Sequence, residues 1–156
     1  LAPDVQDRIA PLWAKSSMSH IRKVKKLDDM DPDFYNKETG PKIPEWAEHP
    51  VVRLHPDTGR PHLYLNEVHF FEIIGLPKDE GDALMRELVE HFHKPENQVR
   101  WRWSDDAIAI WDNQAVQHYA AQDEAGPRYV ERIMTHGKPS TSIAGPRQAA
   151  AETGET

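Results

Sequence analysis

The chain of 156 residues contains no cysteine. Disulfide bonds, thiolate metal sites and cysteine nucleophiles are therefore excluded, and this absence is compatible with the cytoplasm, where we expect the protein. Long hydrophobic runs are also missing. No apolar stretch approaches the ~20 residues that span a bilayer, and no signal peptide is visible, so we expect no membrane association.

Positive charge is scarce as well. The formal net charge is -7, from 19 Lys and Arg against 26 Asp and Glu. Proteins that bind nucleic acids usually present a basic face, so we expect no nucleic-acid partner. The hydrophobic content of 38% and the five tryptophans nevertheless indicate a folded domain with a real core, although the mean hydropathy of -0.76 indicates a polar surface.

Two segments have the periodicity of helices. Residues 3–15 begin with Pro and Asp and repeat apolar residues at helical spacing, which predicts a short helix. Residues 77–92 predict a longer one, because Pro opens the segment and Leu84, Leu88 and Phe92 form a stripe at four-residue spacing.

Other segments favour strands. Residues 51–55 and 62–66 flank a Pro-Asp-Thr-Gly turn and predict a hairpin, and the apolar run 69–74 predicts a third strand or a short bend. The charged stretch 20–48 contains several prolines and is predicted to be a loop.

The last third continues the strand pattern. Val99, Trp101 and Trp103 alternate with arginines, which is typical of a half-buried antiparallel strand, and we expect both tryptophans in the core. Residues 107–111 are continuously apolar and predict a strand covered on both faces. Residues 140–156 have no core-forming pattern and predict a flexible tail.

The most informative pattern follows these strands. His118 comes shortly after an apolar run, and Arg128 and Arg132 are spaced four residues apart. The two arginines would share one face on either a strand or a helix. An imidazole is a common metal ligand and a guanidinium holds carboxylates in a bidentate manner, so the pattern suggests a small anion held beside a metal.

Several separated blocks then occur in a characteristic order. They are His49-Pro50-Val51-Val52-Arg53, His55-Pro56-Asp57-Thr58-Gly59, Gln98 to Trp103, Trp111-Asp112-Asn113-Gln114 with His118 and Ala120, Arg128 with Arg132, and Gly137-Lys138-Pro139. In these blocks the chain resembles the C-terminal part of the taurine dioxygenase (TauD/TfdA) family of Fe(II)- and 2-oxoglutarate-dependent oxygenases. The resemblance implies a mainly β fold with flanking helices, a double-stranded β-helix (jelly roll) that is incomplete in this chain, with one domain over residues 1–139.

The resemblance also implies roles for individual residues. His118 would be an iron ligand, Arg128 would bind the distal carboxylate of the co-substrate 2-oxoglutarate, and dioxygen would be the second co-substrate. Arg132 would bind the anionic group of a sulfonate-type substrate, and Asp112 and Asn113 would help to orient the segment of His118. The alternatives are a hydrogen-bonded histidine at a strand end and two arginines in ordinary salt bridges.

The substrate pocket departs from the taurine-type pattern at two positions. His69 stands where these enzymes usually carry a Phe, and Glu72 stands where the pattern would place an Arg. Both changes alter the shape or charge of the pocket. We therefore expect a small anionic substrate, either taurine itself or, with better support, an alkanesulfonate, a sulfate ester or a related acid, and the release of succinate, CO2 and sulfite or sulfate.

The family's H-x-D iron motif is missing from the expected order of blocks. The segment from Leu1 already resembles the helix that follows this motif, so we expect the chain to be a fragment that is inactive alone. The only literal H-x-D is His55-Pro56-Asp57, whose turn residues argue against a ligand pair. The rival hypotheses are a non-catalytic jelly-roll module that binds small anions and an interaction domain. The sequence leaves open whether the protein forms a homo-oligomer.

Overall fold

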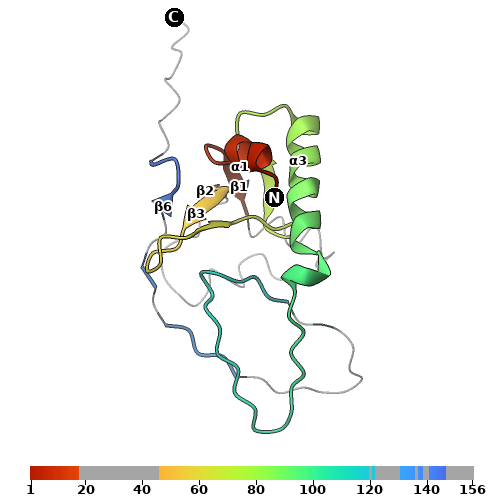
Figure 1. Cartoon of the computed structure of the whole chain (residues 1–156), viewed down its shortest axis with the longest axis vertical. Coiled ribbons are helices and arrows are strands. Elements are labelled where there is room, and N and C mark those ends of the chain that lie inside the picture. Colours follow the sequence, from red (N-terminus) through yellow and green to blue (C-terminus); the bar gives the residue numbers. More distant parts are fainter. Residues whose placement is uncertain (18–45, 120, 122–130, 136, 139–140, 147–156) are drawn as a thin grey trace, which may run out of the picture.

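In the computed structural model, residues 1–17, 46–119, 121, 131–135, 137–138 and 141–146 can be described, and all structural statements below concern these residues. Within these described residues, the chain forms two α-helices and two small antiparallel sheets (Figure 1). None of the described helices is long and apolar enough to cross a membrane. The elements in chain order are α1 (Pro3–Ile9), β1 (Trp13–Ser16), β2 (Ala47–Pro50), β3 (Val52–Leu54), β4 (Pro61–Leu63), β5 (Phe70–Ile73), α3 (Lys78–Phe92), a 3-10 turn (Pro95–Asn97) and β6 (Thr141–Ser142).

The first helix is shorter than the predicted helix over residues 3–15. α1 ends at Ile9, and Trp13–Ser16 form a strand instead. Pro11 explains the end of the helix, because it has no N–H to donate to the preceding turn and its ring obstructs helix continuation. The prediction was therefore wrong for the second half of this segment, where Ala14 is fully buried as part of a strand.

The first sheet has the order β2-β1-β5, with all strands antiparallel. Trp13 lies opposite Pro50, and Ser16 lies opposite Ala47. The pairing of β1 with β5 shifts between Lys15 and Ser16, where the ladder contains an irregularity. β5 confirms the strand predicted within residues 69–74.

The second sheet has the order β4-β3-β6, and its hairpin confirms the one predicted from the sequence. The turn between β3 and β4 is closed by the Gly59 amide, which donates to the His55 carbonyl at 2.8 Å. Gly59 has a φ of 67°, a conformation that glycine adopts without steric cost. β6 pairs with β3 on the other side, with Arg53 opposite Ser142.

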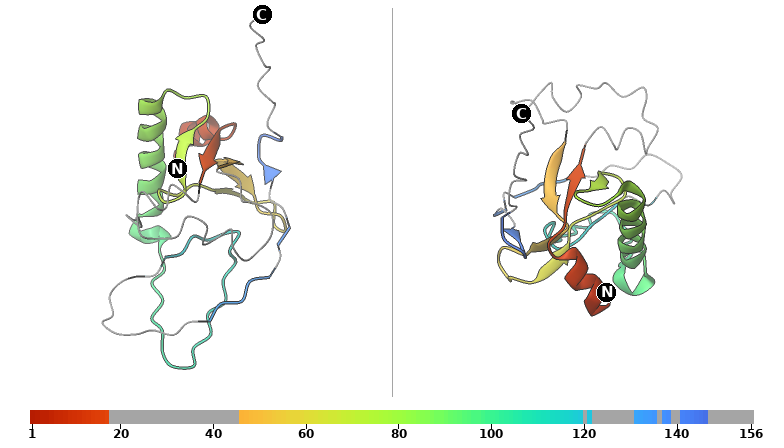
Figure 2. Two further views of the ribbon diagram at one scale, coloured as in Figure 1. Left: turned by 180° about the vertical axis from the view of Figure 1, so that it is seen from behind. Right: turned by 90° about the horizontal axis from the view of Figure 1, so that it is seen from above.

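α3 confirms the predicted helix and provides much of the core. α3 packs against β5 (Figure 2), and Leu84 and Leu88, which are 2% and 0% exposed, belong to the same buried cluster as Phe70 and Ile73 of β5. Gly81, which is also buried, lies on this side of the helix, and a Cβ there would be in ordinary van der Waals contact with the Ile73 side chain at 3.6 Å. The other buried apolar residues of the same cluster are Ile9, Ala14, Val51, Val52, Leu65, Phe70 and Ile73.

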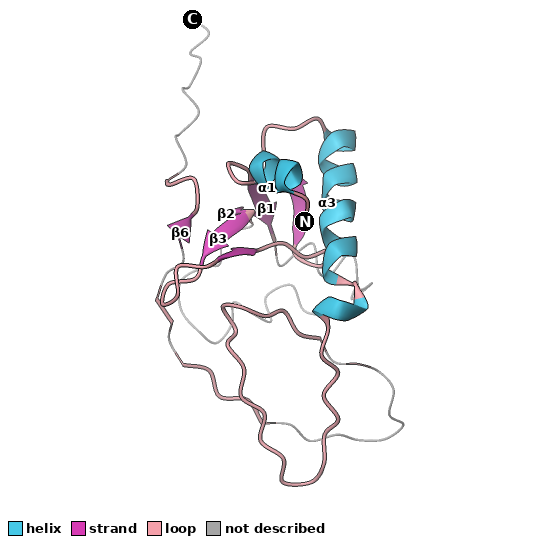
Figure 3. Ribbon diagram, viewed as in Figure 1, coloured by secondary structure: helices cyan, strands magenta, loops and turns pink. Residues whose placement is uncertain are grey.

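The segment after α3 contradicts the sequence-based expectation. Residues 98–119 contain turns and extended chain but no strand (Figure 3). Trp101 and Trp103 are 57% and 42% exposed, so the expectation that they lie in the core was wrong. Ile108 and Ile110, at 83% and 94%, are exposed too, against the prediction of a strand covered on both faces. A strand needs a hydrogen-bonded neighbour and a surface to cover its apolar face, and the described part of the chain supplies neither to this segment.

The described residues include 141–146, which lie within the segment predicted to be a flexible tail. Thr141 and Ser142 form β6, Ser142 is buried, and the Gly145 amide donates to the Ser142 carbonyl at 3.2 Å. The segment predicted to be a flexible tail over residues 140–156 therefore contains a short paired strand. Residues 147–156 lie outside the described part of the chain.

Candidate functional site

His118 follows a tight turn in the extended segment. The turn is closed by the amides of Ala115 and Val116, which both donate to the Asp112 carbonyl at 3.1 Å. The His118 side chain is exposed, and its ring centroid lies 5.2 Å from that of Trp111 at an interplanar angle of 54°. Within the described residues its ring nitrogens have no hydrogen-bond partner, so the imidazole is sterically accessible to a metal ion.

Asp112 connects this turn to the hairpin of the second sheet. One carboxylate oxygen, Oδ1, accepts from the Gln114 amide at 2.8 Å, and the other, Oδ2, accepts from Nε2 of His55 at 2.7 Å. The Gln114 amide and, after it, the His55 imidazole hold the pKa of Asp112 below its usual range. The carboxylate is therefore ionised at neutral pH and can bridge the two segments.

Further contacts bring three segments of the chain together at this point. Lys138 forms an ion pair with Asp57 at 2.6 Å, and its carbonyl accepts from Nε2 of Gln114 at 3.1 Å. Nε2 of Gln117 donates to the Leu65 carbonyl at 2.6 Å. The segment that carries His118 is thus attached to both ends of the β3–β4 hairpin region.

These contacts bear on the His55-Pro56-Asp57 sequence. Nε2 of His55 is engaged by Asp112, and Nδ1 lies 3.3 Å and 3.2 Å from the amide nitrogens of Asp57 and Thr58. The Asp57 carboxylate pairs with Lys138, which lowers the pKa of Asp57 and raises that of Lys138. The interactions of this H-x-D sequence thus agree with a structural turn rather than with a pair of metal ligands.

A second polar cluster lies on β3 and its neighbours and was not singled out from the sequence. The Arg53 guanidinium lies 2.8 Å from Nδ1 of His49 and stacks on the Tyr64 ring, with Cζ 3.2 Å from the ring centroid. Burial lowers the pKa of His49, and the positive charge of Arg53 lowers it further. A signal was present in the sequence, because Arg53 and Tyr64 are on strands that the hairpin prediction already placed side by side.

The remaining predicted site residues are placed only in part. Arg132 is exposed, whereas Arg128 lies outside the described residues. His69 is half-buried in the turn just before β5, and its carbonyl accepts from the Ser17 amide at 2.9 Å. Glu72, the other departure from the taurine-type pattern, pairs with Lys15 across the first sheet at 2.8 Å. The joint role of His118, Arg132 and His69 in one site stays a prediction.

The fit of these residues to iron is incomplete. A neutral imidazole such as that of His118 is a suitable Fe(II) ligand. Among the described residues, however, no group of three His, Asp or Glu side chains could hold a metal ion. His118 therefore fits as a single ligand, and a complete site would require further ligands.

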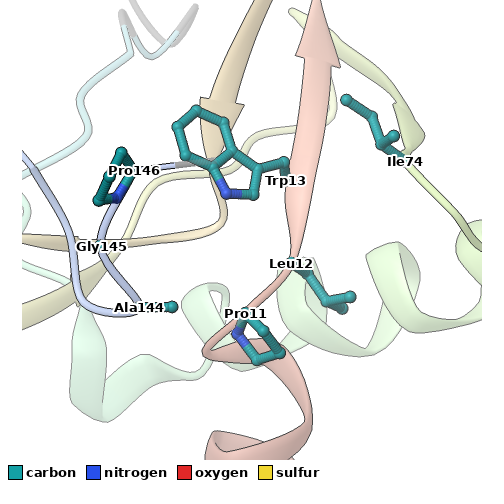
Figure 4. Close-up of a pocket in the computed structure, with 7 residues that line it drawn as sticks. All are labelled: Pro11, Leu12, Trp13, Ile74, Ala144, Gly145 and Pro146. Atoms are coloured by element: carbon teal, nitrogen blue, oxygen red, sulfur yellow. The ribbon is translucent and has the colours of Figure 1, made fainter. Parts of the chain in front are cut away.

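A groove of about 430 Å³ lies elsewhere on the molecule (Figure 4). It lies between the α1–β1 connection, the end of β5 and the residues after β6, and it contains none of the predicted site residues. Its lining has no ionisable side chain, so it does not suit a dicarboxylate or a metal. The lining residues are Pro11, Leu12, Trp13, Ile74, Ala144, Gly145 and Pro146.

Comparison with known proteins resolves the family. The model of the family described as "Taurine catabolism dioxygenase TauD, TfdA family" matches residues 1–134, which include His118 and both arginines. The chain belongs to the TauD/TfdA family. The resemblance seen in the sequence blocks is therefore confirmed.

The names of relatives within this family state several different substrates. An alpha-ketoglutarate-dependent sulfate ester dioxygenase from Pseudomonas putida is 42% identical over 101 residues, which cover 64% of this chain and 33% of the relative. An alpha-ketoglutarate-dependent 2,4-dichlorophenoxyacetate dioxygenase from Cupriavidus pinatubonensis (strain JMP 134 / LMG 1197) is 39% identical over 136 residues, covering 86% of this chain and 45% of the relative. The chain thus spans less than half the length of these relatives.

A solved structure supports the same assignment. The crystal structure of AAD-2 in complex with Mn(II) and N-oxalylglycine is similar to this chain with a TM-score of 0.51 and 25% identity, over 67% of this chain and 38% of that one. The mainly β architecture with few helices is therefore that of TauD-like dioxygenases.

Proposed function

We propose that the protein to which this chain belongs is a dioxygenase that uses 2-oxoglutarate to hydroxylate a small anionic substrate of the sulfonate or sulfate ester type. The observation that carries the proposal is the family match over residues 1–134, which includes the motif around His118. We further propose that the two described sheets are parts of a jelly roll. Because the chain spans less than half the length of its relatives, the activity is assigned to the whole protein.

The overall reaction would consume one substrate C–H bond, one dioxygen and one 2-oxoglutarate, and would yield a hydroxylated carbon, succinate and CO2. Bound Fe(II) would supply the redox chemistry that couples these two oxidations. If the hydroxylated carbon carries a sulfonate or a sulfate ester, the product can break down to an aldehyde with release of sulfite or sulfate. We propose cytoplasmic localisation on the same ground as above, the absence of cysteine.

Three side chains would each bind a different component of the reaction, namely the metal, 2-oxoglutarate or the substrate. His118 would hold the metal through its accessible imidazole. Arg128 would bind the distal carboxylate of 2-oxoglutarate, because a guanidinium forms paired, charge-assisted hydrogen bonds with a carboxylate. Arg132 would bind the sulfonate or sulfate of the substrate, and its exposed position leaves it accessible.

The substrate class rests on two observations. Relatives at about 40% identity are named for a sulfate ester and for 2,4-dichlorophenoxyacetate, both of which carry an anionic group. His69 is half-buried in the turn before β5 and would add a polar group where taurine-type pockets carry a Phe. A sulfate ester or an alkanesulfonate is therefore a better candidate than taurine.

A second candidate function is the binding of small anions without catalysis. It would rest on Arg132, whose exposed guanidinium could bind an anion without a metal. In this case Arg132 would still bind sulfate, but 2-oxoglutarate would not be consumed. The two functions therefore differ in a measurable product.

The test is succinate formation by the whole protein with Fe(II), 2-oxoglutarate and a panel of substrates: taurine, an alkanesulfonate, an alkyl sulfate and 2,4-dichlorophenoxyacetate. We expect turnover with at least one panel member and its loss in His118→Ala. His93→Ala is the matched control, because His93 is an exposed histidine at the end of α3 whose removal should not affect turnover.

The outcomes separate the two functions. If the whole protein consumes no 2-oxoglutarate with any panel member, the dioxygenase proposal is wrong. Sulfate binding that depends on Arg132 but not on metal would then support the anion-binding module. Turnover that survives in His118→Ala at modest iron would show that His118 is not a ligand.

A further inference from the structure

His55 is the buried polar group at the junction between the β3–β4 hairpin and the segment of His118. It is 8% exposed, although it is the first residue after the end of the short strand β3. The residue it contacts, Asp112, is 57 positions away in the sequence. A buried imidazole that joins two distant segments has a role beyond filling space, because its hydrogen bonds define both its tautomer and its orientation.

The surroundings of Nδ1 determine that tautomer. Nδ1 lies 3.3 Å from the Asp57 amide nitrogen and 3.2 Å from that of Thr58, and both amides can only donate. Nδ1 must therefore present its lone pair. The ring proton is then on Nε2, which lies 2.7 Å from Oδ2 of Asp112 and donates to it.

Asp112 uses its second oxygen within its own turn. Oδ1 accepts from the Gln114 amide at 2.8 Å, while the main-chain carbonyl of Asp112 accepts from the amides of Ala115 and Val116. The carboxylate therefore joins the turn before His118 to His55. If the Asp112–His55 hydrogen bond were lost, this turn could rotate away from the hairpin.

We propose that His55, acting through Asp112, is a positioning residue that fixes where His118 presents its imidazole. The inference rests on the proposed function only for the role of His118 as a metal ligand. The Gln117 side chain, which donates to the Leu65 carbonyl at 2.6 Å, attaches the same segment at a second point next to His118. His55 thus acts on the metal ligand through Asp112 and not by contact with a substrate.

Two substitutions separate the functions of the two ring nitrogens. In His55→Asn, the amide oxygen can take the place of Nδ1 as the acceptor for Asp57 and Thr58, but the side chain is too short to reach Asp112. In His55→Gln, the longer side chain can place an N–H donor near the position of Nε2. The first variant keeps the turn and loses the connection, while the second keeps the connection.

The first measurement is made on the whole protein by NMR. Long-range nitrogen–proton correlations of the His55 ring should show a protonated Nε2 and an unprotonated Nδ1. In His55→Asn, the amide resonances of residues 112–118 should shift while those of Asp57 and Thr58 stay close to parental. A protonated Nδ1, or shifts confined to residues 55–60, would overturn the proposal.

The second measurement is the affinity of the whole protein for Mn(II), determined from the loss of the free-ion electron paramagnetic resonance signal. Groups that orient metal ligands typically contribute 10- to 100-fold in affinity, so His55→Asn should weaken Mn(II) binding by roughly that factor. His55→Gln should restore binding to near the parental value. Equal affinities in both variants, or no Mn(II) binding by the parental protein, would overturn the proposal.

Mn(II) binding does not depend on turnover, so the two proposals can fail separately. If Mn(II) binding responds to His55 as expected but no panel substrate is consumed, the dioxygenase assignment fails and the positioning role stands. If turnover occurs but Mn(II) binding is the same in all variants, the dioxygenase assignment stands and His55 is only a turn residue.

Discussion

At the scale of single residues, the surroundings decide what each histidine can do. His118 is exposed and has an accessible ring, His55 is held between a carboxylate and two amides, and His62 is partly buried on strand β4 of the hairpin. Burial lowers the pKa of His62, because the charged form would lose hydration. Residue type alone would have made these three histidines equal candidates for a metal site.

The lowered pKa values of His49 and His62 predict how stability depends on pH. Both groups resist protonation in the folded state, whereas in the unfolded state they titrate near their ordinary value of 6.5. As the pH falls below 6.5, the unfolded state takes up protons first, so the free energy of unfolding should decrease. Urea unfolding followed by far-UV circular dichroism at several pH values between 7.5 and 5 measures this decrease.

His62→Gln is the matched variant for this prediction. It removes one of the two groups, so the difference in unfolding midpoint between neutral and mildly acidic pH should become smaller than in the parental chain. The comparison cancels the effects of the many carboxylates, which are the same in both proteins. An equal or steeper dependence in His62→Gln would contradict the assigned cause.

In the whole protein, alanine substitutions of Arg128 and Arg132 should change different kinetic constants. Arg128→Ala should raise the KM for 2-oxoglutarate, and Arg132→Ala should raise the KM for the anionic substrate while sparing the uncoupled decarboxylation of 2-oxoglutarate. One charge-assisted hydrogen bond contributes about 1.5–3 kcal/mol, which corresponds to roughly a 10- to 150-fold change. Initial rates with each co-substrate varied separately give the two constants.

Arg86→Ala, an exposed arginine on α3, is the control for general effects of lost charge. If Arg128→Ala raised the KM for the anionic substrate and Arg132→Ala raised that for 2-oxoglutarate, the roles of the two arginines would be exchanged. Equal changes of both constants in both variants would mean that the two guanidinium groups serve one site, and the division of roles would be wrong.

At the scale of elements, local sequence signals predicted those parts that contain their own determinants. α3 has a proline at its start and an apolar stripe, and the β3–β4 hairpin has a turn with Gly59, so both predictions were confirmed. Residues 98–119 failed because alternation only shows that a segment could be a strand. Pairing and cover must come from other segments, and a local pattern contains no information about them.

The candidate site shows the same limit. The Asp112 turn could be anticipated from its own sequence, since aspartate commonly accepts hydrogen bonds from amides that follow it. Its contact with His55 spans 57 positions and is visible only in the folded chain. The pairing of Lys138 with Asp57, 81 positions apart, could not be anticipated either.

α3 should contribute a large share of the stability through one side of its surface. Leu88 is 0% exposed, so Leu88→Ala should lower the free energy of unfolding by about 2–5 kcal/mol through lost burial and a residual cavity. Glu87→Ala, at the neighbouring exposed position, should change it by less than about 0.5 kcal/mol. Chemical denaturation of both variants measures the two values, and similar losses would contradict the packing of α3 on the sheet.

At the scale of the whole molecule, the distribution of apolar surface is uneven. The core around α3 and the two sheets is small, while the segment after α3 exposes many large apolar side chains. Folded monomers rarely leave such a set uncovered, and unpaired extended segments can pair with other chains. The members of this exposed set in the segment are Val99, Trp101, Trp103, Ile108, Ile110, Trp111, Val116 and Tyr119.

This exposure predicts that the isolated 156-residue chain associates with itself and turns over little or no 2-oxoglutarate. Ile108 and Ile110 are 83% and 94% exposed, so replacing both with Asp should reduce association while leaving the far-UV circular dichroism unchanged. Ile73→Asp is the contrasting variant, because Ile73 is 2% exposed and a buried charge there should unfold the sheet. Sedimentation velocity at several concentrations and succinate formation with added Fe(II) measure both properties. A monomeric parental chain with robust turnover would contradict the prediction, because a single described imidazole and an uncovered apolar segment would then suffice for catalysis.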